Sequence, residues 1–358
     1  GASQDEANRR DQVIAKMNLG TGYVVLRTHA RINDLLDMDQ MKQLADAPDV
    51  TEFLNRLKET SYGEFEVELN EKVSLDLEKN FTKKFIERIG EIVRITPSKM
   101  GEFLRAYFDF RFEVLNLKRI LRGKFTDSSE EMIKESLIPI DPYLIKDYDD
   151  LVSSESLEVL VRKLNGGAYE SLIGKLDLYK EYDAIWPMEL ELNYIYARNI
   201  LRLTEKLPAK DRHIVNSLVK YETDVENVLI AIKRRGKENV NLDEVFPVTY
   251  GIEKADLKNV IETDDLGKAI DELKKPYNEV LAPIKTGDIA LVRAMLRKGK
   301  YEAATAARAG DQFGFNVILA FLVYSEIEKD NLVGLSWGKA QGLGSEDLLK
   351  YIDRKSVV

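Results

Sequence analysis

The chain has 358 residues, of which 44% are hydrophobic, so it carries enough apolar material for two or three ordinary domains. Its 62 acidic and 53 basic side chains give a formal net charge of −9, which repels phosphate backbones and excludes nucleic acid as a favoured partner. Cysteine is absent, which excludes disulfides, thiolate metal sites and cysteine nucleophiles together. Charged residues make up 32% of the chain, which holds only 21 glycines and 9 prolines. This balance favours long helices over turn-rich structure, so the predicted fold class is all-α.

The first 20 residues open with a polar stretch and lack the apolar core of a signal sequence, so we expect a flexible lead-in. The longest wholly apolar stretch in the chain, residues 317–323, is far shorter than the roughly 18 to 20 residues that cross a bilayer. We therefore expect membrane contact only through a partner. Because the absence of cysteine fits a reducing compartment, we place the chain in the cytoplasm.

Helical periodicity dominates the remainder of the sequence. Apolar residues recur at intervals of three and four, for example within residues 53–57 and 157–164. Helix ends are predicted at Gly123, Gly236 and Gly338, where a residue without a Cβ atom can turn left-handed and close the last turn. No convincing alternation with a period of two predicts a strand.

One motif occurs three times: an acidic residue, an asparagine three positions later, and then an aliphatic residue. The three pairs are Glu113 and Asn116, Asp224 and Asn227, and Glu328 and Asn331. A tyrosine precedes each asparagine by 54, 58 and 54 positions, namely Tyr62, Tyr169 and Tyr277. Because several markers keep their order and spacing, the sequence predicts three related helical subdomains.

A matching amphipathic segment lies ahead of each tyrosine, and the three segments come into register at Val50, Leu157 and Leu266. The second and third copies also open alike, since Pro139 and Pro247 each lie 30 positions before their tyrosine. We therefore divide the chain into the lead-in 1–20 and three helical repeats, with boundaries 21–135, 136–243 and 244–358.

This pattern resembles the C subunit of archaeal-type (A/V-type) ATP synthases, the homologue of the d subunit of the vacuolar ATPase. The stretches that carry the resemblance are residues 23–27, 60–62, 108–124 and 326–331, with Gly338 and Lys339, and it spans about residues 21 to 350. It implies three like helical subdomains arranged as a funnel around a pseudo-threefold axis.

The resemblance also implies a non-catalytic role in the central stalk of a rotary ATPase. The chain is then expected to be a rigid socket that receives the central shaft, made of the D and F subunits, at its wide mouth, while its opposite face sits on the proteolipid ring. Torque would pass through it during ATP synthesis and ion transport, from a position at the cytoplasmic face of the membrane.

The recurring polar residues are the candidate contacts with those partners. The acid and asparagine of each pair lie on one helical face, where they either fix packing between helices or contact the shaft. The basic residues near the helix ends either compensate helix dipoles or bind polar loops of the ring and acidic groups of the shaft. The predicted partner-binding residues are Glu113, Asn116, Arg122, Lys124, Asp224, Asn227, Arg234, Arg235, Lys237, Glu328, Asn331 and Lys339.

The sequence gives little basis for an enzyme. His29 and His213 lie far apart and have no neighbours at ligand spacing, and no phosphate-binding GxxxxGK[ST] loop occurs. We expect no catalytic residue, no cofactor and no metal. The alternative function is an all-helical repeat adaptor or scaffold unrelated to rotary ATPases, although copies of roughly 105 to 115 residues exceed the 20 to 50 residues usual for a solenoid unit.

Overall fold

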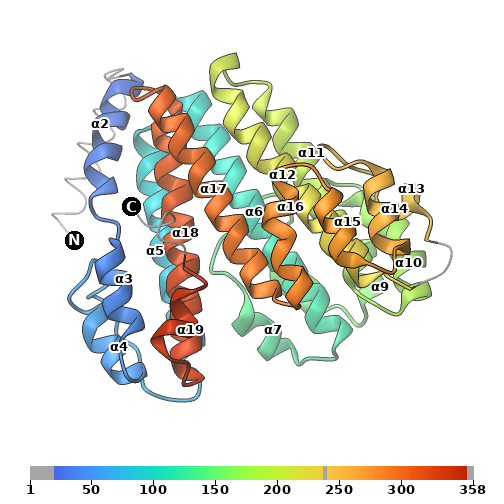
Figure 1. Ribbon diagram of the computed structural model, residues 1–358, viewed down its shortest axis with the longest axis horizontal. Coiled ribbons are helices and arrows are strands. Elements are labelled where there is room, and N and C mark those ends of the chain that lie inside the picture. The colour runs from blue at the N-terminus through green and yellow to red at the C-terminus, as the bar shows by residue number, and fades with distance from the viewer. Residues whose placement is uncertain (1–19, 237–239, 353–358) are drawn as a thin grey trace. The chain divides into compact units, whose positions relative to one another are not determined.

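The computed structural model describes residues 20–236 and 240–352, and within these ranges all of the regular structure is helical (Figure 1). The predicted all-α class is therefore confirmed. The elements before the second long pair of helices are α2 (Thr21–Ile32), α3 (Met38–Ala45), α4 (Val50–Leu57), α5 (Val73–Ile95), α6 (Ser98–Phe125), α7 (Glu130–Ser136), α8 (Tyr148–Val152), α9 (Leu157–Lys163), the 3-10 helix η1 (Glu170–Lys175) and α10 (Leu176–Tyr182). They are followed by α11 (Trp186–Thr204), α12 (Ala209–Lys233), α13 (Leu242–Val245), α14 (Lys254–Glu262), α15 (Leu266–Glu272), α16 (Tyr277–Leu281), η2 (Ala282–Thr286), α17 (Ile289–Gly310), α18 (Phe315–Ala340) and α19 (Ser345–Leu349).

The three amphipathic segments form the short helices α4, α9 and α15, and each begins at the residue where the register placed it. The residue before each helix, Asp49, Ser156 or Asp265, accepts a hydrogen bond from the third backbone N–H of that helix. Such a cap stabilises a helix by about 1 kcal/mol relative to alanine. The same kind of cap thus starts a short helix in each of the three predicted repeats.

Two longer helices follow each group of short helices in the chain: α5 and α6, α11 and α12, and α17 and α18. The second helix of each pair has 28, 25 and 26 residues respectively. These second helices carry the recurring acid and asparagine, so they place the candidate site.

The chain divides into two compact units, of which the first combines Gly1–Leu104 with Pro283–Val358. Within this unit α2, α5 and α17 pack against α18, and Figure 1 shows the blue helices α2 to α4 beside the red helices α18 and α19. Residues 317–328 of α18 are all buried. The longest apolar stretch of the sequence is therefore the middle of a core helix.

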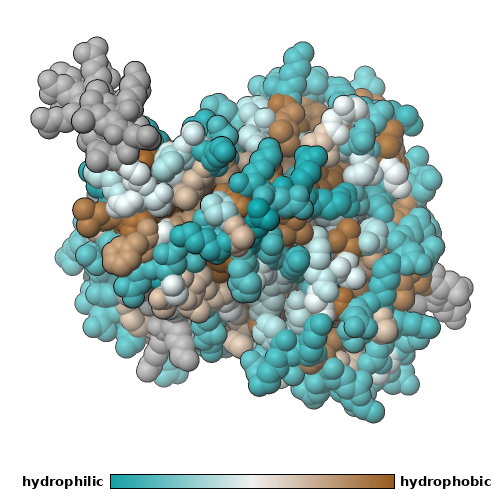
Figure 2. All heavy atoms as spheres, turned by 90° about the horizontal axis from the view of Figure 1, so that it is seen from above, coloured by the Kyte–Doolittle hydropathy of each residue, from teal (hydrophilic) through white to brown (hydrophobic). Residues whose placement is uncertain are grey.

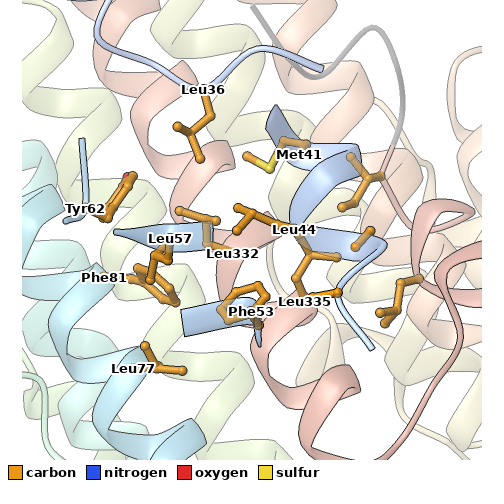
Figure 3. Close-up of a cluster of buried hydrophobic side chains, with 14 of the residues drawn as sticks. Leu36, Met41, Leu44, Phe53, Leu57, Tyr62, Leu77, Phe81, Leu332 and Leu335 are labelled. Atoms are coloured by element: carbon orange, nitrogen blue, oxygen red, sulfur yellow. The ribbon is translucent and has the colours of Figure 1, made fainter. Parts of the chain in front are cut away.

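A cluster of buried side chains joins α3 and α4 to α5, α18 and α19 (Figure 3). It includes Leu36, Met41, Leu44, Phe53, Leu57, Tyr62, Leu77, Phe81, Leu332 and Leu335. Full burial of one such leucine or phenylalanine contributes about 1.5–3 kcal/mol. The cluster therefore fastens the first short helices of the chain to its last long helix.

The second unit is the contiguous stretch Arg105–Ala282. Its centre is the packing of α11 against α12, with α14 also packed against α12 and η1 against α11. Tyr196 donates a hydrogen bond from its hydroxyl to the Tyr107 carbonyl oxygen, and its ring lies edge-on to that of Phe110.

Two of the three predicted helix ends are wrong. Gly236 does follow α12 with a left-handed φ of 70°, but Gly123 and Gly338 lie inside α6 and α18. A Cβ atom at Gly123 would lie 2.4 Å from a side-chain carbon of Ile133, and one at Gly338 would lie 2.2 Å from Leu348. These two glycines are needed because the next short helix, α7 or α19, packs directly on them.

Candidate functional site: three buried carboxylate junctions

The first recurring acid, Glu113 of α6, is fully buried and surrounded by hydrogen-bond donors. The backbone N–H groups of Tyr143, Leu144 and Ile145 donate to its carboxylate, the last two at 2.9 and 3.2 Å to Oε2. The Tyr169 hydroxyl donates to Oε1 at 2.6 Å. The carboxylate therefore ties the segment between α7 and α8, and the tyrosine before η1, to one long helix.

The second acid, Asp224 of α12, has the same set of partners. The N–H groups of Tyr250, Gly251 and Ile252 donate to its carboxylate, and the Tyr277 hydroxyl donates to Oδ2 at 2.8 Å. A Cβ atom at Gly251 would lie 2.4 Å from the Tyr277 hydroxyl oxygen, so only glycine fits between the acid and the tyrosine.

The third acid, Glu328 of α18, accepts from fewer backbone groups and adds a cation. The Leu36 N–H donates to Oε2 at 2.6 Å, and the Tyr62 hydroxyl donates to Oε1 at 2.5 Å. Arg88 of α5 lies with Nη1 2.8 Å from Oε1, and both charged side chains are more than nine-tenths buried. Only this acid of the three has an ion-pair partner among the described residues.

We call these three sites the carboxylate junctions, in the order Glu113, Asp224 and Glu328. Each acid holds the tyrosine of the following copy, because Glu113 binds Tyr169 and Asp224 binds Tyr277. The acid of the last copy holds the tyrosine of the first, Tyr62. The pairing therefore runs in a cyclic order through the three copies.

Burial raises the pKa of Tyr62, Tyr169 and Tyr277 above the usual value for tyrosine, and the adjacent carboxylate raises it further in each case. The three hydroxyls are therefore protonated at neutral pH and can donate. The three tyrosines are therefore packing residues with a satisfied hydroxyl, and their common acceptor is the recurring acid.

The three asparagines are buried beside the acids, but their surroundings differ. Asn116 exchanges two hydrogen bonds with the backbone of Ile138, at 3.0 and 2.7 Å. Asn227 donates to the Val248 carbonyl oxygen and accepts from the Tyr194 hydroxyl. Both side-chain polar atoms of Asn331 are buried without a partner among the described residues. The first two asparagines thus fix packing in equivalent ways, and the third does not.

The cations of the first copy lie nearer the surface. The Arg122 side chain is 59% exposed and pairs with Glu189 of α11, and Lys124 is half-buried. The neighbouring Arg119 donates to the Ser136 carbonyl oxygen. Arg122 is therefore the most exposed of the predicted partner-binding cations that the structure describes.

The cations of the second copy, by contrast, are more buried and are held by contacts within the protein. Arg234 is buried, with its guanidinium 4.4 Å from the ring centroid of Tyr182 and 5.3 Å from that of Trp186. Arg235 is half-buried and donates to the Asp264 carbonyl oxygen at 3.3 Å. Lys237 lies outside the described residues.

In the third copy, Lys339 is buried, and this burial lowers the pKa of its ammonium group. Its Nζ lies 3.4 Å from the Leu343 carbonyl oxygen. Trp337, close to this helix end, is 40% exposed, and its Nε1 donates to Glu78 of α5. The three copies therefore offer different side chains to a partner at equivalent positions.

Sequence reasoning missed Arg88, although it holds the third junction together. Nothing in the repeat marks it, because the other two junctions have no counterpart. It also missed the helix caps, whose signal was present: Asp49, Ser156 and Asp265 each stand directly before the matched apolar segment.

The described residues contain no group of three or more histidine, aspartate or glutamate side chains that could hold a metal ion. The face shown in Figure 2 is mostly hydrophilic, with hydrophobic side chains scattered among charged ones. Within residues 20–236 and 240–352, no helix combines the length and apolar character that crossing a bilayer requires.

The recurring chemistry of the junctions is one of helix packing, since every acid is saturated with internal donors. The fold and the site together define the class of protein: it is all-helical and has three similar carboxylate junctions. The family model of the ATP synthase (C/AC39) subunit matches residues 24–351. The chain belongs to this family.

Relatives named as the C subunit of A-type ATP synthase resemble the chain over nearly its whole length. That of Methanocaldococcus jannaschii is 27% identical over 339 residues, covering 91% of this chain and 84% of the relative. That of Methanosarcina mazei is 26% identical over 352 residues, covering 96% and 95%, and that of Methanosarcina acetivorans is 26% identical over 338 residues, covering 92% and 91%.

Proposed function

We propose that the chain is a non-catalytic central-stalk subunit of a rotary A/V-type ATPase and acts as a rigid socket between the central shaft and the proteolipid ring. The D and F subunits of the shaft and the ring are its proposed partners, and the cytoplasmic face of the membrane is its proposed location. Membership of the ATP synthase (C/AC39) family supports a rotary machine over an unrelated helical scaffold.

The observation that carries the socket proposal is the cyclic order of the carboxylate junctions. A part that transmits torque must resist deformation, and close-packed helices do so because protein interiors are as dense as organic crystals. Each junction adds three or more charge-assisted hydrogen bonds between elements distant in sequence. This pattern supports three repeats, with boundaries near 135 and 243, that close on one another around an approximate threefold axis.

Burial of the acids and asparagines favours internal packing as their role, so we propose the cations nearer the surface as the partner contacts. Arg122 and Lys124 are the best placed, whereas reversal of the buried Arg234 would test folding before it tested binding. Arg235 is half-buried and is proposed as a secondary contact.

The decisive experiment mixes the purified chain with a complex of the D and F shaft proteins and, separately, with detergent-solubilised proteolipid rings. Binding to both supports the socket, and binding to neither supports an adaptor role. The double variant Arg122→Glu/Lys124→Glu should weaken at least one association by about tenfold, since rim charges act mainly through long-range attraction. The matched control is Lys258→Glu/Lys268→Glu on α14 and α15, where both lysines are exposed. If the two double variants bind equally well, Arg122 and Lys124 do not belong to the interface.

A further inference from the structure

The first copy differs from the others in the segment that follows its tyrosine. After Tyr169 the chain forms η1, and from Tyr277 it forms α16 and then η2. After Tyr62, by contrast, residues 65–68 have no helical or turn structure and lead on to α5. This non-helical segment is therefore peculiar to one copy.

The segment alternates acidic and apolar residues from Glu64 to Leu69. Phe65 and Val67 are half-buried and pack against the cluster of Figure 3, whereas Glu64, Glu66 and Glu68 are exposed. Alternation with a period of two is the pattern of a strand with one face on a core and one face in solvent. The segment has the side-chain pattern of a strand and no strand beside it among the described residues.

Its backbone has unused hydrogen-bonding groups. The N–H group of Phe65 donates to the Tyr62 carbonyl oxygen, and the Glu68 carbonyl oxygen accepts from the N–H group of Asn70, but the N–H groups of residues 66–69 have no partner among the described residues. Exposed, unpaired N–H and C=O groups on an extended segment are the feature that a second extended chain can pair with.

A groove runs between this segment and α4, with a volume of about 520 Å³. Leu54 of α4 and Lys58, the residue after α4, line it on one side, while Val67 and Leu69 line it from the segment, and Leu69 is 57% exposed. The groove is thus partly apolar, and it has room for a chain beside the unpaired backbone.

The negative charge of the segment indicates that a chain bound beside it is basic. Glu64, Glu66 and Glu68 have no ion-pair partner among the described residues, and all three lie on the alternate face of the segment. Opposite charges facing one another across paired strands are stabilising, and like charges are destabilising.

We propose that residues 64–69 and α4 form a docking site for an extended peptide that alternates apolar and basic residues. The peptide pairs with the backbone of residues 66–69 as an added strand. Its apolar side chains lie with Phe65, Val67 and Leu69, and its basic side chains lie with Glu64, Glu66 and Glu68. The site is independent of the socket proposal, since no residue assigned there to shaft or ring takes part.

The test uses a fluorescein-labelled peptide of six alternating lysine and valine residues, added to the full-length protein at low salt and followed by anisotropy. Hydrogen exchange measured by mass spectrometry locates the contact. We expect saturable binding and slowed exchange at residues 64–69. No saturation by about 1 mM peptide, which corresponds to a very weak complex, would overturn the proposal.

Two controls separate strand pairing from general charge attraction. The variant Glu66→Gln/Glu68→Gln should bind the peptide about five- to tenfold more weakly, as expected for the loss of two cross-strand charge pairs. Glu130→Gln/Glu131→Gln, which removes two exposed charges from α7, should bind like the wild type. Equal weakening in both variants would mean non-specific attraction and would contradict the site.

A third control leaves the protein unchanged. The same peptide with alternate backbone nitrogens methylated keeps its charges but loses donors for strand pairing, and it should not bind measurably. Equal binding of the methylated peptide overturns the pairing. Amides 66–69 that already exchange slowly in the free protein would mean that another part of this chain covers the segment, and this outcome also overturns the proposal.

Discussion

A tyrosine hydroxyl is the donor that all three carboxylate junctions share. Tyr62, Tyr169 and Tyr277 are each at least nine-tenths buried, and each donates to an acid on a long helix. The hydroxyl is one of several donors to each acid, and a buried carboxylate that loses a donor is destabilised. The hydroxyl therefore contributes to stability in addition to the buried ring.

The tyrosines predict a loss of stability in alkaline solution. Their pKa is raised in the folded protein, so their contribution is complete below the unfolded pKa of about 10 and declines as the pH rises above it, at about 1.4 kcal/mol per pH unit for each tyrosine. The variant Tyr277→Phe should be less stable at pH 8 by about 1.5–3 kcal/mol, the value of a hydrogen bond to a charged group. Above pH 10 its stability should decline less steeply than that of the wild type. Urea unfolding between pH 8 and 11 measures both the loss of stability at pH 8 and its decline above pH 10. If stability declined equally steeply with pH in the variant and the wild type, the role assigned to the Tyr277 hydroxyl would be contradicted.

The asparagines give a comparison within one molecule. Asn227 makes two side-chain hydrogen bonds, whereas Asn331 makes none among the described residues although it is equally buried. Replacing Asn227 with leucine should cost about 2 kcal/mol or more, because it leaves the Tyr194 hydroxyl and the Val248 carbonyl unpaired. Replacing Asn331 with leucine should be neutral or stabilising. Urea unfolding of the two variants decides the matter, and an equal loss in both would show that Asn331 is satisfied.

The acids and asparagines were predictable because they recur, but their partners were not. Tyr169 lies 56 residues from its acid, and Tyr62 lies 266 residues from Glu328. Sequence spacing placed each tyrosine in the same copy as an acid, whereas folding pairs it with the acid of the preceding copy. Arg88 has no recurring counterpart in the sequence, and its role depends on the position of Glu328 in α18.

At the level of helices, the apolar register alone was sufficient to place the starts of α4, α9 and α15. Glycine was ambiguous, because a helix end and a close helix contact both require a residue without a Cβ atom and both can follow basic residues. The alternation of residues 64–69 was missed in the sequence, because a six-residue pattern that stands alone among helical segments does not show whether a partner strand exists.

The close contacts at glycine predict a steric effect. Gly338→Ala would place a methyl group 2.2 Å from Leu348, so it should cost about 1–3 kcal/mol through overpacking. Gly334→Ala in the same helix is the control, because nothing lies within 4 Å of its added Cβ atom, and alanine should raise stability there by up to about 1 kcal/mol. Thermal unfolding compares the two variants. A second change, Leu348→Ala, should reduce the cost of Gly338→Ala, and full additivity would argue against the contact.

The whole molecule is assembled from a contiguous unit and a discontinuous one. Residues 105–282 form one unit from a single stretch, while the other unit requires both 1–104 and 283–358. Composition predicted the helical class, and the recurring markers predicted three copies. The joining of residues 1–104 and 283–358 in one unit was not predictable, because no local pattern records that Tyr62 meets Glu328.

This arrangement predicts an order of folding. Contacts between residues distant in sequence form slowly, because the intervening chain must be closed first. During refolding from urea, amides of α11 and α12 should therefore gain protection before those of α2 and α18. Pulsed hydrogen exchange with mass spectrometry resolves these segments. Earlier protection of α18 would show that the discontinuous unit folds first.

The shorter acid of the second junction has a consequence for exchanging parts between copies. Asp224 reaches its donors with one methylene fewer than Glu113 or Glu328, and Gly251 provides the closer approach by lacking a side chain. The shorter side chain of Asp224 and the missing side chain of Gly251 compensate for each other, so neither residue can be changed alone. A chimera that moves a long helix from one copy to another must move its tyrosine-bearing segment as well, or it will bring a glutamate into space sized for aspartate.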